Sequence, residues 1–168
     1  MMGTVILPIM TIVLNSMGYH LPLFGWAKPV PVNPRNLKHP KLDMVWISLA
    51  GPMANILLAI LGTGALIASA LTLMTTPYFT GVKSLLNQFI LTNLFLAVFN
   101  LIPLLPLDGG KVVSGLLPRR LSYFYEQYEN TMSLVLLMGI MLGLTQFLTY
   151  PVFAAYDLLI HLALGAFQ

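Results

Sequence analysis

Side chains that could do chemistry are scarce in this chain, and one of them stands in an unusual setting. The 168 residues include five acidic residues, three histidines and no cysteine, so disulfides and thiolate metal sites are excluded. Asp108 follows Pro103 and Pro106, which each remove a backbone donor, and precedes Gly109 and Gly110, which permit close or left-handed backbone geometry. We therefore expect a helix to unwind just before Asp108.

Asp108 at this break has two interpretations. Irregular backbone at membrane depth is tolerated only where protein or a wet cavity covers it, so an acidic residue there indicates a metal or polar site. Alternatively, Asp108 is the N-cap of a short helix over 110–117 that ends before Pro118, because aspartate is a favoured capping residue. The local sequence leaves both interpretations open.

The composition predicts a protein that is solvated by lipid. Hydrophobic residues make up 58% of the chain and charged residues only 8%, whereas soluble domains carry about 25% charged residues. About 20 apolar residues span the hydrocarbon core as a helix. We predict one all-α integral membrane domain over 1–168, with about four transmembrane helices plus a C-terminal interfacial or partly inserted helix. The expected spans are 4–18 (partial or re-entrant), 45–73, 85–105 and 131–148, and the interfacial helix is 151–166, which carries Asp157 and His161.

The basic residues predict the orientation of these spans. Loops rich in lysine and arginine stay on the cytoplasmic side, so we expect loops 19–43 and 108–129 to be cytoplasmic in a multi-pass protein of the plasma membrane. Two short basic clusters suit a lipid bilayer as partner better than a nucleic acid. The first loop holds Lys28, Arg35, Lys38 and Lys41, the third holds Lys111, Arg119 and Arg120, and the second holds only Lys83.

Polar residues inside the second and third spans follow helical spacing. Small and polar residues that share one helix face are typical of close helix packing. For Asn55 the alternatives are interhelical hydrogen bonding and hydrogen bonding to a substrate, and the face with Asn100 is expected to turn toward the second span. The two faces are Gly51, Asn55, Ala59 and Thr63 in one span, and Asn93, Ala97 and Asn100 in the other.

Three motifs together resemble the site-2 protease family of intramembrane zinc metallopeptidases, in its compact bacterial branch. Residues 99–103 (Phe-Asn-Leu-Ile-Pro), running into 106–110 (Pro-Leu-Asp-Gly-Gly), resemble the family's third-ligand motif. Residues 50–55 (Ala-Gly-Pro-Met-Ala-Asn) are similar to its second signature, and the loop 24–36 looks like the one that joins core segments. The resemblance covers nearly the whole chain in the right order.

The resemblance implies a zinc metallopeptidase that hydrolyses peptide bonds of membrane-embedded helices. In this family two histidines of an HExxH helix and the aspartate of the Leu-Asp-Gly motif hold zinc, while the glutamate acts as general base on the zinc-bound water. Carried over to this chain, the resemblance assigns Asp108 as a zinc ligand. It also implies that Asn55 and Asn100 lie near the site and hold an extended substrate backbone, with transmembrane proteins as substrates.

The chain departs from the family pattern at one point, because it contains no HExxH. None of its histidines, His20, His39 and His161, has a neighbouring glutamate. The resemblance begins downstream of the catalytic helix, so we expect a chain that lacks this N-terminal helix, through a misplaced start, a frameshift or real loss. With no catalytic glutamate present, the chain alone should be inactive.

Three other functions remain in competition with a protease that is active in its complete form. The chain is a non-catalytic membrane protein that binds transmembrane segments, a partner of a second polypeptide that supplies HExxH, or a small transporter or channel subunit. The last is least favoured, because transporter sites of this kind use paired broken helices and this chain shows only one.

Overall fold

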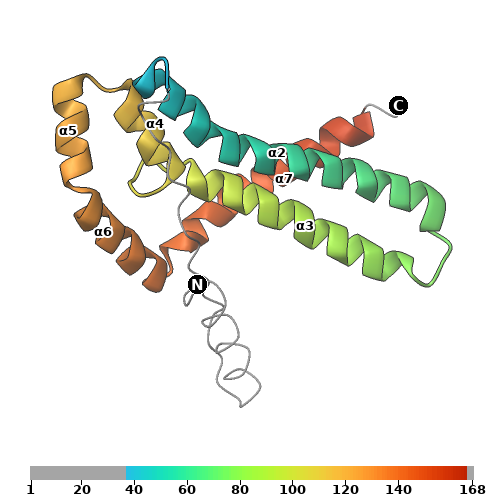
Figure 1. Ribbon diagram of the computed structural model, residues 1–168. Coiled ribbons are helices and arrows are strands. Elements are labelled where there is room, and N and C mark those ends of the chain that lie inside the picture. Colours follow the sequence, from blue (N-terminus) through green and yellow to red (C-terminus); the bar gives the residue numbers. More distant parts are fainter. Residues whose placement is uncertain (1–36, 166–168) are drawn as a thin grey trace, which may run out of the picture. The chain divides into compact units, whose positions relative to one another are not determined.

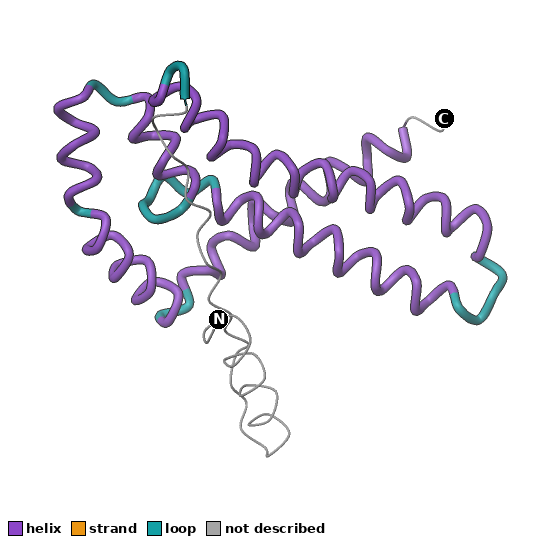
Figure 2. Tube along the Cα trace, viewed as in Figure 1, coloured by secondary structure: helices purple, strands orange, loops and turns teal. Residues whose placement is uncertain are grey.

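The computed structural model describes residues 37–165, and these form helices joined by short turns (Figure 1; Figure 2). No strand occurs within this range. The helices are α2 (Pro40–Leu73), α3 (Phe79–Asn100), α4 (Asp108–Leu116), α5 (Arg119–Gln127), α6 (Glu129–Met141), the short 3-10 helix η2 (Leu144–Leu148) and α7 (Thr149–Gly165).

Three helical segments in the described range are long and apolar enough to cross a membrane: Pro40–Leu73, Phe79–Asn100 and Leu144–Gly165. The prediction of an all-α membrane protein is therefore confirmed. Helix α2 begins with Pro40 in its first turn, where a missing N–H costs nothing. Its 34 residues extend about 50 Å, well beyond the roughly 30 Å of the hydrocarbon core.

Helices α2 and α3 form a long antiparallel hairpin (Figure 1) whose close packing depends on small residues. Ala59 is fully buried. A β-carbon on Gly62 would lie 2.9 Å from the Phe89 ring and 3.0 Å from Ile90. Only a residue without a side chain lets the two backbones approach this closely. The predicted close packing is confirmed for Ala59 and Thr63, which are both buried, whereas Gly62 was not among the predicted residues.

Helix α7 completes the core by packing against this hairpin. Val152 of α7 joins Ala59, Ile90 and Leu94 in one buried cluster. The Tyr156 hydroxyl donates a hydrogen bond to the Asn87 side-chain oxygen at 2.8 Å. A polar group in lipid needs such a partner, so this bond fixes α7 against α3.

The C-terminal third differs from the expected single span over 131–148. Helix α6 has 13 residues and ends at Met141, and Gly143 adopts a left-handed conformation with φ 78°. Left-handed backbone is readily available only to glycine, so the chain turns here and restarts. The expected C-terminal helix over 151–166 is present as α7, and together with η2 it forms the segment Leu144–Gly165, which is long and apolar enough to cross a membrane.

Several predictions lie outside the described residues. These are the partial span 4–18, the loop motif 24–36 and His20. The assignment of 1–168 to one domain stays a prediction for the same reason.

Candidate functional site

The helix break before Asp108 occurs where the prolines predicted it. Helix α3 ends at Asn100, and tight turns follow, in which Leu104 N–H donates to Ile102 at 2.7 Å and Leu107 N–H donates to Leu104 at 2.9 Å. Asp108 is the first residue of α4. Leu107 occupies the N-cap position, and no side chain caps this helix. The capping interpretation of Asp108 is therefore wrong.

The Asp108 side chain instead turns toward α2. Its Oδ2 atom lies 3.2 Å from the position that a β-carbon on Gly51 would occupy. The side chain retains 29% of its exposure, and Oδ1 accepts a hydrogen bond from Lys111 Nζ at 3.0 Å. The Ala-Gly-Pro and Leu-Asp-Gly motifs, which lie more than fifty residues apart in sequence, therefore meet at this carboxylate.

The two glycines after Asp108 allow α4 to pack against the turn that precedes it. Both are buried. A β-carbon on Gly110 would meet the backbone of Leu104 and Leu105 at 2.5 Å, and one on Gly109 would overlap the carbonyl oxygen of Leu101. These backbone atoms have no flexible side chain that could move aside. The glycines thus let the turn fold back on the first turn of α4, beside Asp108.

The three asparagines in the second and third expected spans differ in burial and in hydrogen bonding. Asn55 is half-buried one helical turn after Gly51 on the same face of α2, so its β-carbon lies about 5–6 Å from that of a residue at position 51. Asn93 is buried and donates to the Phe89 carbonyl at 2.8 Å. Asn100 is half-buried as the last residue of α3. No hydrogen bond joins the Asn55 or Asn100 side chain to another described residue, so the placement of both asparagines at the Asp108 site stays a prediction.

A polar cluster of two buried serines, Ser114 and Ser122, and the exposed Glu126 joins α4 to α5. Glu126 accepts hydrogen bonds from Ser114 at 2.5 Å and Ser122 at 3.1 Å, and the two serine hydroxyls lie 2.9 Å apart. The Tyr125 hydroxyl donates to the Pro103 carbonyl at 2.7 Å, and partial burial raises the pKa of this hydroxyl. The cluster ties the helix that carries Asp108 to α5. Sequence reasoning missed it, although the four-residue spacing of Ser122 and Glu126 is a signal for it.

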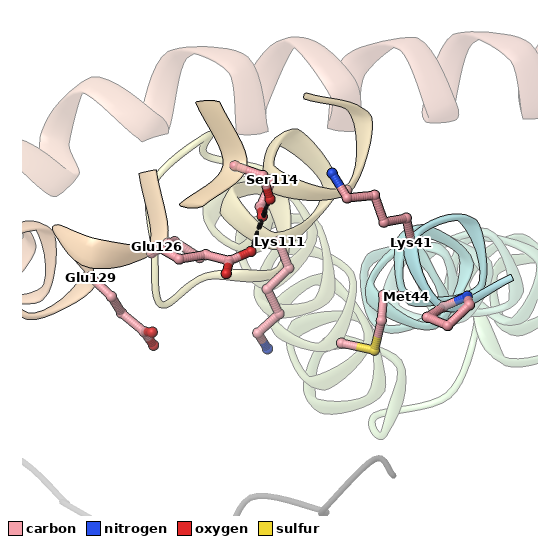
Figure 3. Close-up of a pocket in the computed structure, with 10 residues that line it drawn as sticks. Lys41, Met44, Lys111, Ser114, Glu126 and Glu129 are labelled. Carbon is pink, nitrogen blue, oxygen red and sulfur yellow. Dashed lines mark hydrogen bonds between the residues drawn. The ribbon is translucent and has the colours of Figure 1, made fainter. Parts of the chain in front are cut away.

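A cavity of about 390 Å³ opens next to this cluster, between the start of α2 and helices α4, α5 and α6 (Figure 3). Lys41, which lines it, donates to the Leu117 carbonyl at 2.9 Å and so connects α2 to the end of α4. The remaining lining is mixed in charge, with Lys111 facing Glu126 and Glu129 across the opening. Charged side chains thus border an open cavity whose wall is otherwise largely apolar.

The described residues alone do not make a zinc site. Catalytic zinc takes three protein ligands and an open position, but no group of three or more histidine and acidic side chains gathers within residues 37–165. Asp108 fits as one ligand, because its carboxylate is partly accessible and only one of its oxygens is paired. His39 is exposed at the start of α2, and His161 lies on α7, so neither joins Asp108 in this range.

Comparison with known proteins gives the same family as the motifs. The family model described as peptidase family M50 matches residues 67–143. A Bacillus subtilis protein named "Putative zinc metalloprotease YwhC" is 35% identical over 149 residues, which cover 86% of this chain and 68% of that protein. No solved structure matches significantly. A multi-pass helical protein with an aspartate at a proline-broken helix is thus placed among the metalloproteases of membranes. The chain belongs to peptidase family M50, the site-2 protease family.

Proposed function

We propose that this chain is the substrate-binding and third-ligand part of an intramembrane zinc metallopeptidase, whose complete form hydrolyses peptide bonds of membrane-embedded helices. The main support for this proposal is the close approach of the Asp108 carboxylate to Gly51, because it brings two family motifs together. Gly51 lies on an exposed face of α2. In the complete site Asp108 holds zinc, and bound zinc would lower the pKa of its water to make a nucleophile.

Asn55 and Asn100 bind the substrate in this proposal. A helix that is to be cleaved must first present an extended backbone, whose donors and acceptors need partners inside the membrane. The side-chain amide of Asn55 offers both a donor and an acceptor one turn from Asp108. The substrates are transmembrane proteins of the plasma membrane, and the loops 19–43 and 108–129 are cytoplasmic.

The 168 residues by themselves hydrolyse nothing in this proposal, since they contain no HExxH. One test is to read the DNA upstream of Met1 in all frames for an HExxH-encoding stretch and to purify the chain with and without it. The extended chain should hold one zinc and cleave a transmembrane model substrate, and Asp108→Ala should lose both properties. Asp43→Ala, a change at an acidic residue far from the motif, should lose neither. Equal zinc content in the Asp108→Ala chain would contradict the proposal.

The second candidate is a non-catalytic protein that binds transmembrane segments. It is favoured by the single zinc ligand among the described residues. This candidate predicts that no zinc purifies with any form of the chain and that Asp108→Ala leaves binding of a transmembrane segment unchanged. Zinc content that disappears with Asp108→Ala would exclude it.

A further inference from the structure

Helix α7 has one face in the core and one that no described residue covers. Val152 and Tyr156 pack into or against the buried cluster. Asp157 and His161 are exposed, and they lie about 140° and 180° around the helix from Val152. The two ionisable residues of α7 therefore stand near the centre of its outward face.

This face belongs to a segment that is long and apolar enough to cross a membrane. Asp157 is only about 4 Å along the axis from the midpoint of the span Leu144–Gly165. The adjacent Tyr156 bonds to Asn87, which follows the start of α3 by about 12 Å. Within residues 37–165 no ion pair or hydrogen bond engages the side chain of Asp157 or of His161. Ionisable groups are costly in hydrocarbon, and lipid tails offer them no partner.

Charge complementarity indicates what covers this face. Asp157 and His161 are an acidic and a basic group four residues apart, so they share one side of the helix. Two copies in one membrane have the same orientation, and their α7 helices would run parallel. Asp157 of one copy and His161 of the other would then differ by about 6 Å in height along the helix axes, a separation that the two side chains can bridge.

Small residues on the outward face of α7 allow two α7 helices to come as close as the Asp157–His161 pairing requires. Ala154 and Gly165 are exposed on the outward face, about 200° and 220° around the helix from Val152. Small residues let two transmembrane helices come close enough for polar side chains to meet. A face made for lipid alone would carry larger apolar residues at these positions, as the flanking Leu158 and Leu162 do.

We propose that the outward face of α7 is a dimer interface, in which Asp157 of each copy hydrogen-bonds to His161 of the other. The pairing covers two polar groups that no described residue covers. It places the interface on the side of α7 opposite to Val152, and it does not depend on whether the chain belongs to an active protease.

Cysteine cross-linking tests the proximity directly, because the chain contains no cysteine of its own. The full chain carrying Ala154→Cys is oxidised in native membranes and separated without reductant. The expected product is a disulfide-linked species of twice 18.5 kDa that contains this chain alone by mass spectrometry. Leu61→Cys, at an exposed position of α2, is the matched control and should give none. Absence of the product, or cross-linking to a different protein, would overturn the proposal.

Complementation between two variants tests the Asp157–His161 pairing. In chains that carry the Ala154→Cys reporter, Asp157→Leu or His161→Leu alone should lower the dimer yield roughly threefold to thirtyfold. Co-expression of differently tagged Asp157→Leu and His161→Leu chains restores one pair between unlike copies. Random association gives a mixed-dimer yield of twice the geometric mean of the two like-dimer yields, so the mixed dimer should exceed this level severalfold. A mixed dimer at the random level would overturn the pairing, even if a variant folds less well.

Discussion

The carboxylate of Asp108 lies against Gly51, with Oδ2 3.2 Å from the position of a β-carbon there. Because the chain has no cysteine, Gly51→Cys combined with Asp108→Cys should be linked by a short bifunctional thiol reagent. Gly64 lies about 20 Å further along α2, so Gly64→Cys combined with Asp108→Cys should stay unlinked. The measurement is the mass of the α2–α4 peptide pair after digestion. Equal linkage in both pairs would contradict the observed packing of α4 on α2.

The Lys111 ammonium competes with any cation for Asp108, because it donates to Oδ1 at 3.0 Å. Both side chains are partly exposed, so the pair stabilises the fold by under about 1 kcal/mol. Lys111→Met should leave the unfolding midpoint nearly unchanged, and in the chain extended by HExxH it should strengthen zinc binding several-fold in chelator competition. Lys83→Met, which removes an exposed lysine from α3, is the control. Weaker zinc binding in Lys111→Met would show that the lysine orients Asp108 instead of blocking it.

The close approach at Gly110 should make this position sensitive to one added methyl group. A β-carbon there would meet the backbone of Leu104 and Leu105 at 2.5 Å. Gly110→Ala should therefore lower the free energy of unfolding by roughly 1–3 kcal/mol, as overpacking does elsewhere. Gly81→Ala is the matched control, since nothing lies within 4 Å of its added β-carbon. Denaturation in detergent, followed by circular dichroism, compares the two, and equal midpoints would disprove the predicted clash.

Glu126 should contribute more to stability than its neighbour Glu129. It accepts hydrogen bonds from Ser114 and Ser122, whose side chains are both buried. Glu126→Ala leaves these hydroxyls only each other as partner, so it should cost about 1–3 kcal/mol of unfolding free energy. Glu129 is exposed like Glu126, but its side chain has no hydrogen bond among the described residues, so Glu129→Ala should cost under about 0.5 kcal/mol. The same unfolding assay measures both variants, and similar losses would mean that the cluster does not secure α4 to α5.

The sequence by itself determined the class of the protein and the place of its break. Few charges and long apolar stretches predict membrane helices, because lipid cannot solvate ions. Pro103 and Pro106 predict the end of α3, because proline lacks the N–H that a helix needs. The motifs around Asp108 predicted the family, which the comparisons confirmed. These inferences depend on composition and on short motifs, which can be recognised from neighbouring residues alone.

The tertiary structure decided which residues meet. Asp108 could cap α4 or face α2, and only the packing of α4 against Gly51 distinguishes the two. The sequence predicted one span across Gly143, since hydropathy does not record a left-handed φ at one residue. The turn at Gly143 also places Asp157 and His161 in the candidate span Leu144–Gly165, which the sequence alone did not delimit. Contacts between distant segments arise from packing, which no single stretch of sequence specifies.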